Sequence, residues 1–140
     1  MTMADIKKSD RFLSQIRNAD KEITDILNQI NYLRYKASGA TGIRYDKDHV
    51  QTSPSDMVCE ALAEAVDMEQ HLSVRHRELL QMRQQAENIT QLLSENERYL
   101  IRCYYLDRIS MTETADRLHM SSRNAYRVKA SALIEFSKHL

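Results

Sequence analysis

The chain has little of what interrupts a helix, with two glycines, one proline and no tryptophan among 140 residues. It also lacks an apolar run of about 18 residues, which argues against a membrane-spanning helix, and a secretory signal at its start, which predicts a cytoplasmic protein. Cys59 and Cys103 are far apart and predict small buried thiols, with no disulfide and no zinc site. These absences exclude collagen-like, disulfide-framework, membrane and all-β proteins, and they favour the all-α class.

Positive charge gathers toward the end of the chain. The whole sequence is neutral, with 20 basic and 20 acidic residues, but residues 94–140 hold eight basic and six acidic side chains. From Ser122 onward there are four basic side chains and one acidic one. The last segment therefore carries a weak positive field, which suits an anionic partner.

Two apolar stripes with spacings of three and four residues run along residues 1–93. They flank a polar stretch, residues 38–55, that contains both glycines and the proline. The first stripe is Phe12, Ile16, Ala19, Ile23, Ile26, Ile30, Leu33 and Ala37, and the second is Val58, Ala61, Ala65, Met68, Leu72, Arg75, Leu79, Met82, Ala86, Ile89 and Leu93. Such a sustained period predicts a long helical hairpin or coiled coil over residues 1–93, with a loop at 38–55 and Pro54 at the first helical position of the second helix.

Two helices with one stripe each bury little apolar surface. Four leucines flank the stripes and widen their apolar faces: Leu13, Leu27, Leu62 and Leu80. We therefore expect a homodimer through these helices, in a four-helix arrangement. An intramolecular hairpin that packs on the C-terminal helices is the alternative, and the sequence leaves both open, together with the role of the loop.

After Leu93 the pattern changes to short helices, each opened by a serine that can cap it. Ser94 and Ser110 are each followed three positions later by a glutamate, the capping-box pattern, and they predict helices that end near residues 106 and 118. Ser121 predicts the start of a last helix that continues to about residue 138. Residues 94–140 are thus predicted to form a small three-helix domain.

Residues 114–127 have the anatomy of a helix-turn-helix. Ala115 is small where two helices would cross, and Leu118 and Met120 bracket the turn between them. The exposed start of the last helix would then enter the major groove of a DNA duplex. A three-helix module that binds another protein through the same packing is the alternative.

The side chains at this helix start are of the types that read DNA. Arginine can bridge N7 and O6 of guanine and asparagine can pair with adenine, so we predict that Arg123, Asn124 and Arg127 read bases. Tyr126 either contacts a base methyl group or a sugar, or it covers the helix crossing. The other predicted DNA contacts, chiefly to the phosphate backbone, are Thr112, Ser121, Ser122 and Lys129.

Residues 93–133 (LSENERYLIRCYYLDRISMTETADRLHMSSRNAYRVKASAL) resemble region four of bacterial sigma factors and the related helix-turn-helix of response regulators. That family often has glycine where His119 stands, and histidine tolerates the left-handed backbone better than most residues. Lys129 replaces an aliphatic residue that commonly points inward in the family, and Val128 is expected to take over that packing.

The order of the predicted regions, a coiled coil, a polar loop and a C-terminal helix-turn-helix, resembles that of the late-gene transcriptional activators of phages and prophages. The segments INYLRYKASGA and EAVDMEQHL, ahead of the helix-turn-helix, are similar to that group too. The resemblance implies a sequence-specific DNA-binding regulator that activates phage late genes with host RNA polymerase, in the host cytoplasm. The alternatives are a helical adaptor that binds RNA polymerase or a sigma factor without DNA contact, and a small subunit of phage DNA packaging.

Enzyme activity is not expected. The sequence holds no nucleophile motif, metal-ligand spacing or phosphate-binding glycine loop, so we predict no catalytic residue, no metal and no cofactor. Two pairs of carboxylates, Glu22 with Asp25 and Glu64 with Asp67, lie beside the apolar stripes. Their position predicts a solvated coiled-coil face instead of a metal site.

Overall fold

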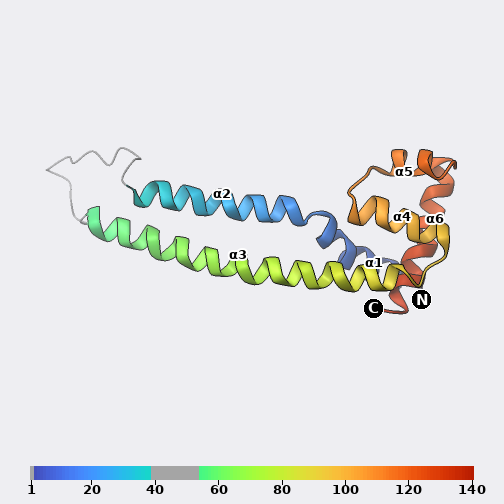
Figure 1. The fold of residues 1–140 in the computed structure, drawn as a ribbon, viewed down its shortest axis with the longest axis horizontal. Helices are drawn as coiled ribbons and strands as arrows, with labels where there is room; N and C mark the ends of the chain where they lie inside the picture. The colour runs from blue at the N-terminus through green and yellow to red at the C-terminus, as the bar shows by residue number, and fades with distance from the viewer. Residues whose placement is uncertain (1, 39–53) are drawn as a thin grey trace. The chain divides into compact units, whose positions relative to one another are not determined.

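The computed structural model describes residues 2–38 and 54–140, and every regular element in these two ranges is helical (Figure 1). This confirms the all-α class. No helix within them is long and apolar enough to cross a membrane. The elements are α1 (Thr2–Arg17), α2 (Ala19–Ala37), α3 (Pro54–Thr90), α4 (Glu95–Ile101), the π-helix η1 (Arg102–Leu106), α5 (Met111–Arg117) and α6 (Ser122–Ser137).

Pro54 is the first residue of α3, as predicted, whereas nearly all of the predicted loop at 38–55 lies outside the described residues. The first apolar stripe is not carried by one helix, because α1 ends at Arg17 and α2 begins at Ala19. Asparagine at position 18 suits such a break, since its side chain competes with the backbone for hydrogen bonds.

Contacts divide the chain into two compact units. We call Met1–Ala19 with Glu78–Leu140 the helical module, and Asp20–Arg77 the hairpin unit. This division differs from the predicted boundary between residues 93 and 94. A segment as short as residues 94–140 encloses little core by itself, and α1 with the end of α3 supplies the missing apolar surface.

The core of the helical module draws on every helix in it. Its fully or almost fully buried members include Leu13 of α1, Ala86 and Ile89 of α3, Leu100 and Ile101 of α4, Tyr105 of η1, Ala115 of α5, and Ala125, Ala132 and Phe136 of α6. Cys103 is also buried, as predicted. Cys59, in the hairpin unit, is exposed, so the expectation of a buried thiol is wrong there.

Helix α1 packs closely on α6 inside the helical module. The buried Ser9 hydroxyl donates to the carbonyl oxygen of Leu133 at 2.7 Å, and a small side chain at this point lets the two helices approach. Farther along α1, the rings of Phe12 and Phe136 lie with their centroids 6.0 Å apart. These contacts explain why the first helix of the chain joins a module formed mainly by the last third.

A hydrogen bond also connects α1 to η1. The Tyr105 hydroxyl donates to Oδ1 of Asp10 at 2.6 Å, while the tyrosine ring is fully buried. Burial, with the adjacent carboxylate, raises the pKa of Tyr105 well above its ordinary value. The phenol therefore stays protonated and serves as a fixed donor.

The helix predicted to end near residue 106 is present, but its last turn is wider than an α-helical one. The Asp107 N–H donates to the Arg102 carbonyl at 2.8 Å, a bond that spans five residues. This π-helical turn brings Tyr105 and Leu106 into the core.

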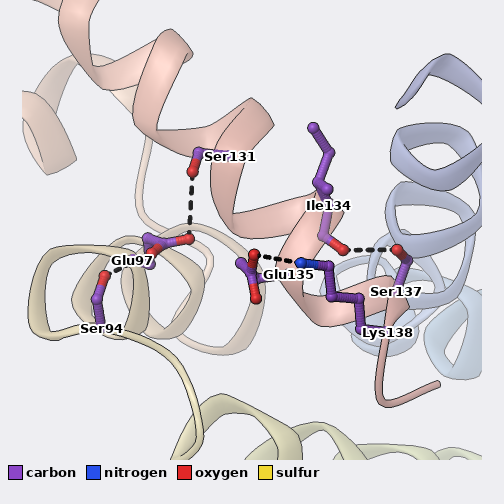
Figure 2. Close-up of polar contacts among 7 residues, drawn as sticks. All are labelled: Ser94, Glu97, Ser131, Ile134, Glu135, Ser137 and Lys138. Carbon is purple, nitrogen blue, oxygen red and sulfur yellow. Dashed lines mark hydrogen bonds and ion pairs between the residues drawn. The ribbon is translucent and has the colours of Figure 1, made fainter. Parts of the chain in front are cut away.

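Two of the three predicted serine caps form. The Ser110 hydroxyl accepts from the Glu113 N–H at 3.2 Å, and the Ser121 hydroxyl accepts from the Asn124 N–H at 3.1 Å. Ser94 differs, because its hydroxyl donates to Oε1 of Glu97 at 2.5 Å (Figure 2). The other carboxylate oxygen of Glu97 accepts from Ser131 of α6 at 3.5 Å, so the glutamate links α4 to α6.

In the hairpin unit, α2 and the first part of α3 run side by side in opposite directions (Figure 1). The members of the two predicted stripes that are buried between them include Ile30, Leu33, Ala61 and Ala65. Arg75, the one charged member, has its Nη2 atom 3.1 Å from Oε1 of Glu22 on α2. This ion pair lowers the pKa of Glu22, and a second pair joins Arg34 to Glu69.

Candidate nucleic-acid interface

A sharp turn joins α5 to α6 in the helical module. His119 has a φ of 55°, which confirms the left-handed backbone expected where the resembling family has glycine. The Met120 N–H donates to the Ala115 carbonyl at 3.0 Å and the His119 N–H to the Asp116 carbonyl at 3.1 Å. These two bonds are those of a Schellman motif, which ends α5 within one residue and turns the chain toward α6.

One side of α6 is held in the core. Ala125 is fully buried and Ala115 of α5 is almost so, and the small side chains at both positions allow α5 and α6 to pack closely. Val128 is half-buried against the same core, which fits its expected packing role. The core contacts fix which face of α6 remains exposed.

The exposed face at the start of α6 consists of Ser122, Arg123, Tyr126 and Arg127, and we call these four residues the α6 edge. Their positions fall on one side of a helix, so the four side chains project together. Tyr126 is 56% exposed, and both of its predicted roles stay predictions. Asn124, predicted to read a base, is half-buried beside this edge.

The two arginines of the α6 edge are unpaired in the part of the chain that the structure describes. Within residues 2–38 and 54–140, neither Arg123 nor Arg127 forms an ion pair or a side-chain hydrogen bond. By contrast, Nη2 of Arg117 on α5 lies 3.0 Å from Oε1 of Glu113, and this contact raises the pKa of Arg117. The first turn of α6 contains no acidic residue that could neutralise the edge.

Lys129 is placed differently from the other predicted contacts. It is half-buried, and its ammonium nitrogen lies 4.5 Å from the centroid of the Tyr104 ring and 5.8 Å from that of Tyr126. Arg17 of α1 lies over the same Tyr104 ring at 4.4 Å and donates to the Tyr104 carbonyl at 2.9 Å. Lys129 thus has an internal role, and its phosphate contact stays a prediction.

Sequence reasoning missed this cation–aromatic stack. Arg17 and Tyr104 are 87 positions apart, and no local pattern connects them. The only signal was Lys129 itself, a charged residue at a position where the resembling family has an inward aliphatic one.

Two other residues that are predicted to contact the DNA backbone, Thr112 and Ser121, precede the α6 edge in the sequence. Thr112 is exposed near the start of α5. Ser121 is exposed, and its hydroxyl oxygen accepts the capping bond, which leaves its own proton available for a phosphate oxygen.

The part of the chain that the structure describes contains no group of three His, Cys, Asp or Glu side chains that could hold a metal. No protein-family model, no curated protein and no solved structure matches the chain.

Proposed function

We propose that this protein is a sequence-specific, double-stranded DNA-binding transcriptional regulator. In this proposal α5 and α6 form a helix-turn-helix, and the α6 edge enters the major groove. Arg123, Asn124 and Arg127 read base edges, while Thr112, Ser121 and Ser122 contact the backbone.

Two observations carry the proposal. Arg123 and Arg127 have no ion-pair or hydrogen-bond partner for their side chains among the described residues, and Arg123 lies at the positive end of the α6 helix dipole. A cation in the first turn of a helix is disfavoured by about 0.3–1 kcal/mol, because the free amide groups there already carry partial positive charge. α6 has Arg123 in its first turn and Arg127 one turn later, with no acidic side chain in that first turn. A bound anion, such as a DNA backbone, would remove this unfavourable arrangement.

The exposed apolar surface of the hairpin unit supports a homodimer as part of the proposal. Large apolar side chains that stay exposed on α2 and α3 include Leu27, Tyr32, Tyr35, Leu62, Val66 and Val74. A second copy of the chain would cover them, and it would present two α6 edges to two half-sites. Late-gene activation with host RNA polymerase follows from the resemblance to phage activators.

The test is DNA binding by the full chain, with fragments selected from the genome that encodes it. The double variant Arg123→Ala/Arg127→Ala should lose at least about tenfold in affinity and show a weaker salt dependence, since it makes fewer phosphate and base contacts. Arg77→Ala, which removes an exposed helical arginine from the hairpin unit, is the matched control and should bind normally.

Unchanged binding by the double variant would contradict the proposal. An absence of any binding at low salt would favour the adaptor that contacts a protein without DNA, because phosphate contacts are strongest there. The solution mass tests the assembly, since a regulator should be a dimer and a packaging subunit a larger ring.

A further inference from the structure

A pocket of about 550 Å³ lies in the helical module between α1 and the last residue of the chain. Its lining combines apolar side chains, three cationic side chains and one amide: Ala4, Phe12 and Leu140; Lys7, Lys8 and Arg11; and Gln15. Positions 4, 7, 8 and 11 recur at the spacing of one helix face, so α1 presents them together. The pocket is open to solvent, and its volume is sufficient for an inserted side chain or a small ligand.

The apolar part of the pocket is fixed by the core beneath it. Phe12 is half-buried, and its ring centroid lies 6.0 Å from that of the fully buried Phe136. Leu140 also packs against the core. The pocket floor is therefore preformed, which lowers the entropic cost of binding.

The three cations of the pocket are exposed. Lys7, Lys8 and Arg11 form no ion pair with any residue in the two described ranges. Asp10, the carboxylate next to them in sequence, already accepts hydrogen bonds from Tyr105 and Ser14. Three positive charges thus surround an apolar floor.

We propose that this pocket binds an acidic peptide segment of a partner protein. The peptide would insert an apolar side chain against Phe12 and Leu140, while its carboxylates pair with Lys7, Lys8 and Arg11. Charge complementarity selects an acidic partner, and the apolar floor selects a peptide over a nucleic acid, whose phosphate backbone would leave that floor exposed to water. This site is separate from the α6 edge and does not depend on DNA binding.

The experiment measures binding of the full chain to three fluorescein-labelled probes. The first is a short peptide in which glutamates flank a phenylalanine and a leucine. The second is the same peptide with serine at both apolar positions, and the third is a short DNA duplex of random sequence. The proposal predicts that the first peptide binds most tightly.

Two variants and one control locate the binding. Lys7→Gln/Lys8→Gln/Arg11→Gln should weaken binding of the first peptide about tenfold, the sum expected for three exposed ion pairs. Ala4→Trp, at an exposed lining position, should fill the pocket and weaken binding without a change of charge. Lys21→Gln/Lys36→Gln/Arg77→Gln removes three exposed cations from the hairpin unit and should leave binding unchanged.

Three results would overturn the proposal. One is no binding of the first peptide, or binding that neither pocket variant weakens. Another is equal binding of the serine peptide, which would leave the apolar floor without a role. The third is tighter binding of the duplex that depends on Lys7, Lys8 and Arg11 but not on Ala4, which would make α1 a nucleic-acid surface.

Discussion

The ammonium nitrogen of Lys129 lies 4.5 Å from the centroid of the Tyr104 ring. The guanidinium carbon of Arg17 lies 4.4 Å from the same centroid. Tyr104 therefore joins a cation of α1 to a cation of α6 within the helical module. Because Lys129 also lies 5.8 Å from the centroid of the Tyr126 ring, the stack reaches the α6 edge.

Loss of the Lys129 charge should destabilise the helical module. Lys129→Gln should lower the free energy of unfolding by about 1 kcal/mol, since a half-buried cation–π contact is worth more than an exposed one. Lys129→Arg keeps the charge over the ring and should retain most of the stability. Urea unfolding measures both, and equal stability of Lys129→Gln and the wild type would contradict the internal role.

The buried Tyr105 should make the protein lose stability in alkali. Its pKa is raised in the folded state, so above about pH 10 the unfolded chain releases a proton that the folded chain keeps. This stability is fully present below the ordinary tyrosine pKa and falls as the pH rises beyond it. Tyr105→Phe should remove this part of the pH dependence and cost about 1 kcal/mol at neutral pH, through loss of the bond to Asp10.

Chemical unfolding as a function of pH measures the Tyr105 effect. Tyr32→Phe is the matched control, because Tyr32 is 60% exposed. An alkaline profile that Tyr105→Phe leaves unchanged would show that the phenol does not hold its proton in the folded state.

The Glu22–Arg75 ion pair should make stability depend on pH in the acidic range. The contact with Arg75 lowers the pKa of Glu22 in the folded state. The stability that the ion pair contributes is therefore present above the ordinary carboxyl pKa and is lost as the pH falls below that value. Glu22→Gln should flatten this part of the acid profile, with an effect below about 1 kcal/mol because the pair is partly solvated. Asp25→Asn, which changes an exposed neighbour on α2, is the matched control.

His119 gives a direct test of the turn between α5 and α6. Its φ of 55° suits glycine and opposes β-branched residues. His119→Gly should keep or slightly raise the melting temperature, whereas His119→Val should destabilise the module by about 1–2 kcal/mol. Thermal unfolding compares the two, and a valine variant as stable as the glycine variant would argue against the Schellman turn.

Local signals in the sequence predicted local structure well. The caps at Ser110 and Ser121 and the left-handed backbone at His119 each depend on a few neighbouring residues, and each is present. The exposure of Arg123 and Arg127 follows equally from helix periodicity, once Ala125 is recognised as a core residue.

The partners of α1 could not be predicted in this way. A stripe of apolar residues shows that a helix has a face to bury, but it does not show against what. The bonds that place α1 in the helical module join residues far apart in sequence, Ser9 to Leu133 and Asp10 to Tyr105. The internal place of Lys129 likewise required Arg17 and Tyr104, which come from two other elements.

The most direct test of the central claim is the affinity of Arg127→Ala for a selected genomic fragment and for random DNA, measured at one salt concentration. If the α6 edge reads bases, Arg127→Ala should lose about 1–3 kcal/mol of binding free energy on the selected fragment and much less on random DNA. The variant should also show a weaker preference at one base pair of the selected site. Equal losses on both DNAs would contradict base reading by Arg127.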